Sequence, residues 1–313
     1  MTRSVRMTAQ TDTLLQRRQQ LPPSRTAVVH PVKASAITAA AEAQRLGLIV
    51  PVLIGPAARV QAAAEEAGVD IGGWERIDVE HSHAAAAEGA ALAASGRVEV
   101  LMKGSLHSDE LLEAVVRPEA GLRTDRRISH AYLMTIASYP TSFIITDAAV
   151  NILPDLQAKA DIVQNAVDLW RAVFDTAPKV AILAAVEVVN PKMPATLDAA
   201  ALCKMADRGQ ITGCLIDGPL AFDNAVSREA AAEKGIVSPV AGAADIMVVP
   251  DIEAGNMLAK QLTFLSGAEA AGIVLGARVP IVLTSRADNE RSRLLSCALA
   301  GLLAAARKAG RIK

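Results

Sequence analysis

Short apolar segments rich in Val and Ile alternate along the chain with longer segments of helical composition. The pattern predicts strands at 27–29, 48–54, 98–102, 143–146, part of 180–189, 211–216, 246–249, 273–275 and 281–284. It predicts helices at 34–46, 57–67, 81–94, 109–116, 156–174, 195–206, 224–234, 254–265 and 288–308. Because the strands are apolar along their whole length, they need cover on both faces, and the long helical connections allow parallel pairing. The pattern therefore predicts a doubly wound α/β protein.

Length and composition narrow the fold class further. With 313 residues the chain exceeds the size at which one hydrophobic core usually keeps growing, so we expect two domains or one large α/β unit. Apolar residues make up 51% and aromatic residues only 3%, which is typical of helices packed on parallel sheets. The pattern is interrupted near 135–150, where we expect a domain boundary. The polar segment 1–24 is expected to be a leading helix or a frayed tail outside the site.

Charge and cysteine content exclude several classes of partner. The net charge of −1 argues against a nucleic acid or an anionic membrane as the main partner. Cys203, Cys214 and Cys297 lie far apart without CxxC spacing, which indicates reduced thiols in a cytoplasmic protein. The sequence shows neither an export signal nor a run of about 18 uncharged apolar residues. Metal-binding patterns such as HExxH are missing, so we expect no metal site.

Polar residues follow several of the predicted strands at their carboxyl ends. Ligands of open parallel sheets bind at this edge, so these residues are the candidates for a functional site. Several of the turns also begin helices, whose N–H groups and positive dipole end attract anions. The sequence therefore predicts a polar, anionic ligand, with candidate residues Lys103, Ser105, Asn190, Asp217, Asn256, Ser285 and Arg286.

Each candidate also has a purely structural interpretation. Ser285 with Asp288 three residues later fits the cap of a helix, and Arg286 can pair with Glu290 one turn away. Lys103 can extend into solvent instead of meeting an anion, and Asp217 with Gly218 is an ordinary turn signal. GxGxxG, GxxxxGK[ST] and GxSxG motifs are absent. From the residues alone, the interpretation ends at an α/β enzyme that binds an anionic small molecule.

The same strand-end segments carry a resemblance to a known family. They include "AVVHPVKASAITAAAEAQRLGLIVPVLIGP", "LMKGSLHSDELLEAVV", "RRISHAYLM", "VEVVNPKMPATLDAAAL", "IDGPLAFDNAVS" and "VVPDIEAGNMLAKQLTFLSGAEAAGIVLGARVPIVLTSRADNERSR". In this order they resemble the phosphate acetyltransferase and phosphate butyryltransferase family over about residues 25 to 310. "NPKMPATLDA" and "DGPLAFDNAVS" look more like the butyryl branch.

The resemblance implies a fold and an activity. The activity is reversible transfer of a short acyl group, acetyl or butyryl, between coenzyme A and inorganic phosphate, with coenzyme A as a substrate and no tightly bound cofactor. The implied fold has two α/β domains with mainly parallel sheets, like isocitrate and isopropylmalate dehydrogenases, and a cleft between them. It predicts a first domain of 25–135 plus 277–313, a second domain of 136–276 and an N-terminal extension of 1–24. The family's members are usually homodimers.

The resemblance also implies roles for individual residues. The family's Ser-Arg pair matches Ser285 and Arg286, its Ser-containing segment matches Ser129 and His130, and its Lys after an Ala-Gly-Asn turn matches Lys260. Donors and cations of this kind suit a reaction in which negative charge develops on a carbonyl oxygen and on a departing phosphate. A guanidinium holds two phosphate oxygens at once, and Ser285 would donate to the developing oxyanion.

The sequence departs from the acetyl branch at the position of the general base. A base is needed because the thiol of coenzyme A must lose its proton. The carboxylate often assigned to this role lies six residues after the Arg, where this chain has Ser292; Asp288 and Glu290 are the possible substitutes. Two alternatives therefore stay open at this point, namely an acyl-CoA-binding relative without acyl transfer and an NAD(P)-dependent dehydrogenase on the same fold.

Overall fold

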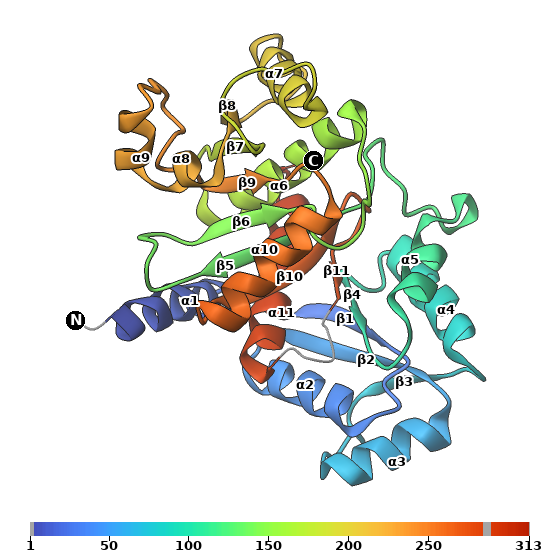
Figure 1. Cartoon of the computed structure of the whole chain (residues 1–313). Coiled ribbons are helices and arrows are strands. Elements are labelled where there is room, and N and C mark those ends of the chain that lie inside the picture. Colours follow the sequence, from blue (N-terminus) through green and yellow to red (C-terminus); the bar gives the residue numbers. More distant parts are fainter. Residues whose placement is uncertain (1–2, 284–288, 313) are drawn as a thin grey trace. The chain divides into compact units, whose positions relative to one another are not determined.

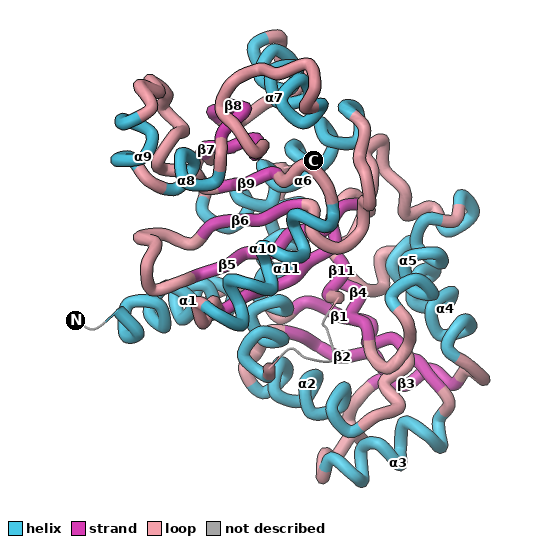
Figure 2. The backbone as a smooth tube through the Cα atoms, in the orientation of Figure 1, coloured by secondary structure: helices cyan, strands magenta, loops and turns pink. Residues whose placement is uncertain are grey.

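The computed structural model describes residues 3–283 and 289–312 and shows an α/β fold (Figures 1 and 2). The strands are β1 Ser24–Val29, β2 Ile49–Gly55, β3 Glu75–Asp78, β4 Val100–Lys103, β5 Ser129–Thr135, β6 Phe143–Thr146, β7 Lys179–Leu183, β8 Leu215–Leu220, β9 Ile246–Val248, β10 Glu269–Leu275 and β11 Ile281–Val282. The helices are α1 Arg3–Gln19, α2 Ala34–Arg45, α3 Ala57–Ala67, α4 Ser82–Ala94, α5 Ser108–Val116, α6 Leu156–Phe174, α7 Pro194–Asp207, α8 Phe222–Val226, α9 Arg228–Glu233, α10 Ile252–Leu265 and α11 Glu290–Lys308, with a 3₁₀ turn at Pro118–Ala120. None of the helices in the described residues is both long and apolar enough to cross a membrane.

The chain divides into two compact units. Unit 1 comprises Met1–Thr11, Arg127–Ala270 and Ile312–Lys313, and unit 2 comprises Asp12–Arg126 and Ala271–Arg311. The predicted α/β class with mostly parallel strands is confirmed. The domain boundaries expected from the sequence, and the cleft between the domains, stay predictions.

Unit 2 is built on the strand order β3-β2-β1-β4-β11-β10. β1 runs parallel to β2 and β4, and β11 runs parallel to β4 with Val282 opposite Met102. Helices α2, α3 and α11 contact one another on one face, and α4 and α5 contact each other on the opposite face (Figure 1). Because the strands are parallel, β1, β4 and β11 end at the same edge of the sheet, which we call the carboxyl edge of unit 2.

Unit 1 is built on the strand order β5-β6-β9-β7-β8. β6, β9, β7 and β8 run parallel, whereas β5 runs antiparallel to β6, with Ala131 opposite Thr146. The amino end of β5 therefore lies at the carboxyl edge of this unit. Helix α6 contacts β5, β6 and β9, while α10 contacts β6 and α8 contacts β7. A buried apolar cluster that includes Phe143, Met247 and Leu262 fills the space under α8 and α10.

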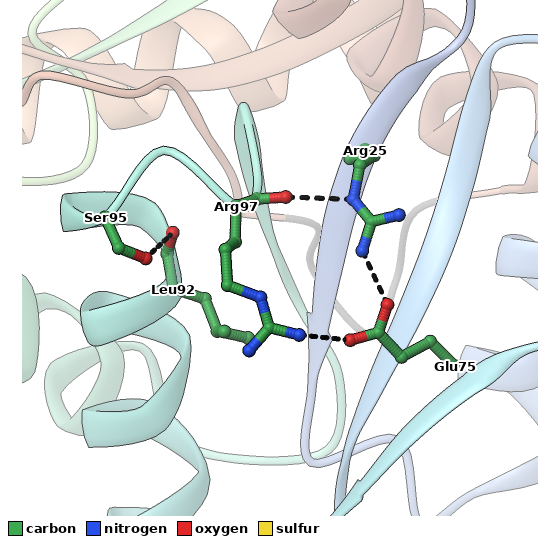
Figure 3. A network of polar contacts seen from close by, with 5 residues as sticks. All are labelled: Arg25, Glu75, Leu92, Ser95 and Arg97. Atoms are coloured by element: carbon green, nitrogen blue, oxygen red, sulfur yellow. Dashed lines mark hydrogen bonds and ion pairs between the residues drawn. The ribbon is translucent and has the colours of Figure 1, made fainter.

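The amino edge of unit 2 carries a network of surface charges (Figure 3). Arg25 donates to the backbone oxygen of Arg97 at 2.9 Å, and both guanidinium groups bind the carboxylate of Glu75, at 2.5 and 2.6 Å. The three side chains come from β1, β3 and the turn before β4, so the network spans the starts of the four strands from β3 to β4. Exposed ion pairs contribute only about 0 to 1 kcal/mol each, so this network serves mainly to neutralise the edge.

Arg18, in helix α1, is the largest fully buried side chain of unit 2. Its guanidinium donates to the backbone oxygen of Leu48 at 2.7 Å, to the hydroxyl of Ser24 at 3.0 Å and to the backbone oxygen of Leu21 at 3.2 Å. It packs on Gly301 of α11, where a Cβ atom would overlap its Nε. A charged group can stay buried here because its two terminal nitrogens donate hydrogen bonds and a residue without a side chain makes room for its Nε, which has no acceptor among the described residues.

Several strands differ from the prediction. The apolar pattern does not predict β3 or β5. β3 alternates between exposed and half-buried residues as an edge strand, and β5 begins with the polar pair Ser129-His130. The strand predicted at 211–216 begins only at Leu215, and the strand within 180–189 ends at Leu183. The predicted helix at 288–308 begins at Glu290.

The packing of Arg18 on Gly301 generates a test of stability. Gly→Ala in a helix interior normally stabilises a protein by about 1 kcal/mol. Gly301→Ala should instead destabilise this one by about 1 to 3 kcal/mol, because the new methyl group overlaps a buried side chain that cannot move without losing its hydrogen bonds. Urea unfolding measures the change. The control repeats Gly301→Ala in an Arg18→Met background, where the penalty should shrink. A more stable single variant would contradict this account.

Candidate functional site

A hollow of about 260 Å³ lies at the carboxyl edge of unit 2. Lys33 and Ser35 reach it from the start of helix α2, Lys103 from the end of β4, Ser105 from the turn after β4, and Arg293 from the first turn of α11. Three of these five side chains are cationic. The strand order places β1 beside β4 and β4 beside β11, and the residues that follow β1 and β4 line the hollow together with Arg293 of α11.

A glycine gives the turn after β4 its shape. The N–H of Gly104 donates to the backbone oxygen of Val29 and the N–H of Ser105 donates to that of His30, both at 2.9 Å. A Cβ atom at position 104 would overlap the Val29 oxygen and lie 2.8 Å from the His30 oxygen. The turns that follow β1 and β4 can approach so closely only because residue 104 has no side chain. This approach presents Lys103 and Ser105 to the hollow.

The local electrostatics of the hollow favour an anion. Lys103 Nζ donates to the backbone oxygen of Leu106 at 3.2 Å, and an Arg293 Nη1 donates to that of Ser35 at 3.5 Å. The side chain of the N-cap residue Lys33 does not cap α2, and the N–H of Ala36 binds the backbone oxygen of Lys33 at 3.0 Å, so within the described residues the N–H groups of Ala34 and Ser35 are left for solvent or a ligand. No acidic side chain lines the hollow among the described residues. A cationic surface and a helix N-terminus on one wall suit a phosphate or carboxylate.

The structure brings two of the predicted binding residues, Lys103 and Ser105, to this hollow. The predicted catalytic residues Ser285, Arg286 and Asp288 lie outside the described residues. The helix cap predicted from Ser285 and Asp288 is replaced by Asn289, whose Oδ1 accepts the N–H of Ser292 at 2.8 Å at the start of α11. Asparagine is among the strongest N-cap residues, which explains why the helix begins here.

At the carboxyl edge of unit 1, the buried carboxylate of Asp147 is a centre of hydrogen bonds. It accepts the N–H of His130 at 3.1 Å and the N–H groups of Ala149 and Val150 at 2.9 and 3.0 Å. It also accepts the side-chain amide of Asn151 at 2.6 Å. One acceptor therefore holds the start of β5 and the loop after β6 together, and charged acceptors of this kind are about twice as strong as neutral ones.

The predicted residues Asn256 and Lys260 lie one turn apart on α10. The resemblance implied a turn at Ala-Gly-Asn, and this expectation is wrong, because α10 begins at Ile252 after the N-cap Asp251. Asn256 donates to the backbone oxygen of Ala148 at 3.2 Å. Gly255 permits this contact, since a Cβ there would lie 2.7 Å from the backbone oxygen of Asp147. The loop after β6 is thus fixed from both sides.

Ser129 and His130 are buried at the amino end of β5. The hydroxyl of Ser129 accepts a hydrogen bond from the side-chain amide of Asn165 at 2.9 Å, and the ring of His130 packs edge-on against Tyr132. Burial lowers the pKa of His130 from its ordinary value of 6.5 to about 4, although the carboxylate of Asp147 opposes this shift. The imidazole is therefore neutral at physiological pH and suits a packed or hydrogen-bonding role better than a cationic one.

Of two further candidates, Asp217 does not lie where the sequence analysis expected it, whereas Asn190 lies in a loop after a strand. Asp217 was expected in the turn after a strand, but it lies within β8 and pairs with Ala181. The error follows from the strand boundary, because β8 starts four residues later than predicted. Asn190 lies in the loop between β7 and α7, where its Oδ1 accepts the N–H of Lys192 at 3.0 Å and its backbone oxygen accepts the hydroxyl of Thr196 at 3.0 Å. Its described contacts shape that loop.

The sequence analysis missed three residues of these two edges. Lys33 and Asp147 both come soon after predicted strands, so the strand-end rule could have found them had it been applied to segments 27–29 and 143–146. Arg293 lies in the fourth position of α11, and no motif in the residues themselves distinguishes it. Within the described residues no group of three His, Cys, Asp or Glu side chains is arranged to hold a metal ion.

The matching family model and the curated relatives point to one family. The family model described as "Phosphate acetyl/butaryl transferase" matches residues 82–300. A phosphate acetyltransferase of Rhizobium meliloti is 59% identical over 290 residues, covering 93% of this chain and 92% of the relative. A phosphate butyryltransferase of Clostridium acetobutylicum is 41% identical, covering 86% and 89%. The crystal structure of a branched-chain phosphotransacylase from Enterococcus faecalis V583 superposes with a TM-score of 0.79 at 29% identity, covering 90% of this chain and 99% of that one.

The buried His130 generates a test of pH dependence. Its folded-state pKa of about 4 lies below the ordinary value of 6.5, so the unfolded chain takes up this proton first as the pH falls. The free energy of unfolding should therefore fall between pH 6.5 and 4, with a slope from this residue of up to about 1.4 kcal/mol per pH unit. Denaturant unfolding across this range, compared between the native protein and His130→Gln, isolates the contribution. Equal slopes in the two proteins would exclude a depressed pKa at His130.

Proposed function

The chain belongs to the phosphate acetyl/butyryl transferase family, and we propose that it reversibly transfers a short acyl group between coenzyme A and inorganic phosphate. The observation that carries the proposal is similarity to phosphate acetyltransferases and butyryltransferases along almost the whole chain. The cationic hollow at the carboxyl edge of unit 2 supports it, because a phosphate or acyl phosphate is an anion of the kind that this edge favours.

The reaction sets the requirements for the site. The thiolate of coenzyme A attacks the carbonyl carbon of an acyl phosphate, a C–S bond forms, and the C–O bond to phosphate breaks as phosphate leaves with the electron pair. Negative charge develops first on the carbonyl oxygen and then on the leaving phosphate, so fixed donors and cations near both oxygens lower the barrier. The thiol proton goes to a general base.

In the proposal Ser285 and Arg286 contact the acyl phosphate. They follow β11 in the sequence, and the last residue of that strand, Val282, pairs with Met102, next to Lys103. The planar guanidinium suits two phosphate oxygens, and the hydroxyl suits the developing oxyanion. Lys103 at the end of the neighbouring strand β4, and Ser105 in the turn that follows it, are proposed to bind the same substrate, since both line the hollow.

The proposed general base is Asp288, because Ser292 stands where the acetyl branch has a carboxylate. Ser292 lies in the first turn of α11, where its N–H binds Asn289 and its backbone oxygen accepts the hydroxyl of Ser296 at 2.8 Å. A serine hydroxyl does not take up a proton at neutral pH, so the base must be another group. Glu290 is the other carboxylate in this segment and is exposed at the start of α11.

In unit 1, Asn256 and Lys260 are proposed to bind substrate, because they lie four residues apart and so share one face of α10. For Ser129, His130, Asn190 and Asp217 the binding role stays a prediction. The proposal includes a homodimer in the cytoplasm and coenzyme A as a substrate with no tightly bound cofactor. The three cysteines of the chain are all unpaired thiols, which supports a reducing compartment.

The two alternatives are not favoured. A dehydrogenase or an acyl-CoA-binding protein without acyl transfer would have to arise within a family whose named relatives at this level of identity are acyltransferases. The acyl group is short in the proposal. Its length depends on side chains from several loops, and one methylene changes binding by only about 1 to 3 kcal/mol.

The direct test is an assay of acyl-CoA formation. Acetyl, propionyl and butyryl phosphate are each mixed with coenzyme A, and thioester formation is followed by its absorbance. We expect turnover with at least one of these substrates, and the ratio of their kcat/KM values identifies the preferred acyl group. An absence of turnover with all three would refute the proposed function.

Arg286 generates a mutational prediction. Arg286→Ala should lower kcat by roughly 100-fold or more, because one preorganised donor to transition-state charge is typically worth that much. Arg286→Lys should recover part of the loss, since the charge returns without the bidentate geometry. The matched control is Arg208→Ala, an exposed arginine after α7 in unit 1. Steady-state kinetics of Arg286→Ala close to those of the control would remove Arg286 from the mechanism.

A further inference from the structure

We propose that Lys33 and Arg293, together with the first turn of α2, form a binding site for a terminal phosphoryl group. This inference rests on the proposed function, because it assigns part of one of that reaction's substrates to these residues. Neither residue belongs to the Ser-Arg pair or to the other residues implied by the family resemblance. Both line the hollow at the carboxyl edge of unit 2, with Lys103 on the wall between β4 and the following turn.

Lys33 is a cation with no carboxylate partner in residues 3–283 and 289–312. It is the N-cap residue of α2 and has extended backbone angles, with φ −133° and ψ 143°. Its side chain is exposed and forms no ion pair in the described structure. The cations of the opposite edge behave differently, because Arg25 and Arg97 both bind Glu75 (Figure 3). Lys33 therefore keeps its charge available at the rim of the hollow.

Arg293 is half-buried and faces the same helix start. Its one hydrogen bond in the described structure runs from Nη1 to the backbone oxygen of Ser35, at 3.5 Å. A guanidinium has five N–H donors, so most of its donors are available to a ligand. The contact with Ser35 also fixes the guanidinium against the first turn of α2, which lowers the entropy lost when a ligand binds.

The start of α2 adds donors to the two cations. The helix is 12 residues long, and no side chain of the described residues caps its N-terminus. By contrast, α4 is capped by the side chain of His81, which accepts the N–H of Ala84 at 3.1 Å, and the N–H of Ala57 at the start of α3 binds Asp78 at 2.8 Å. Uncapped N–H groups beside two cations are the usual surroundings of a bound phosphate.

The size and the walls of the hollow limit the ligand. Its volume of about 260 Å³ lies below the 300 to 1,000 Å³ typical of sites for drug-sized molecules, so it cannot enclose a whole coenzyme A molecule. Ala36, Ala39 and Met102 make part of its wall apolar. A phosphoryl group carrying two negative charges matches the two cations Lys33 and Arg293. Such a group occurs in inorganic phosphate, in an acyl phosphate and at the 3′ position of coenzyme A.

The test removes the two charges and measures each substrate separately. We expect Lys33→Gln and Arg293→Gln each to raise the KM of the bound substrate by roughly 10-fold or more, with kcat changed less than about threefold, because the interactions are made equally in the ground and transition states. Arg293→Lys should recover part of the affinity. The matched control is Lys308→Gln, which removes the same charge at the far end of α11, where Lys308 pairs with Glu99.

The substrates distinguish the two sources of the phosphoryl group. A rise in KM for acyl phosphate and for inorganic phosphate in the reverse reaction assigns the site to the small substrate. If the variants raise the KM for coenzyme A but have the same KM as the native protein for dephospho-coenzyme A, the site binds the 3′-phosphate. Either result supports the site. If every KM stays within about twofold of the Lys308→Gln control, or if only kcat falls, the inference is wrong.

Direct binding separates a failure of this inference from a failure of the proposed function. If the native protein forms no acyl-CoA, the proposed function fails, and the site is then tested by the rise of the unfolding midpoint with added inorganic phosphate or adenosine 3′-phosphate. Loss of this rise in a Lys33→Gln, Arg293→Gln double variant supports the site. An equal rise in the double variant and the native protein, or no rise in the native protein, overturns it.

Discussion

The candidate site of unit 2 depends on the parallel pairing of β1, β4 and β11. Because these strands share a direction, three chain segments that are far apart in sequence leave the sheet at one edge. The close approach of Gly104 to Val29 and His30 brings the turns that follow β1 and β4 together. The cations of the hollow are neighbours for this reason, and they would be scattered by any other strand order.

In unit 1 a buried carboxylate, that of Asp147, holds the carboxyl edge together. Parallel strands bring β6 and β9 to this edge, but the antiparallel strand β5 contributes its amino end instead. The carboxylate of Asp147 joins these parts, since it accepts N–H groups from β5 and from the loop after β6. Helix α10 then packs on that loop through Gly255 and Asn256. Hydrogen bonds and the packing of Gly255 therefore hold this edge together.

The sequence predicted the fold class and the family well because both rest on features that repeat along the chain. Strands rich in Val and Ile are recognised from the apolar pattern, and the bounds of most helices were predicted to within a few residues. The failures have local causes. β3 alternates in burial and β5 starts with Ser129 and His130, so neither looks like a buried strand. Asp217 was predicted to follow a strand but lies within β8, because that strand begins later than the apolar pattern predicts. The N-cap of α11 is Asn289 and not the predicted pair Ser285 and Asp288. Lys33 and Arg293 meet only in three dimensions, so no linear motif could pair them.

The burial of Arg18 limits how far the N-terminus of the protein can be shortened. Residues 1–24 look dispensable in the sequence, yet this side chain satisfies the backbone oxygen of Leu48 and fills the space beside α11. A shortened chain that starts at β1 would leave the Leu48 oxygen with the N–H of Ser24, at 3.2 Å, in place of two donors, and it would open a void in the interior. Removal of the polar N-terminal segment to improve expression would therefore destabilise the sheet that carries the cationic hollow, although the hollow itself lies at the other edge of that sheet.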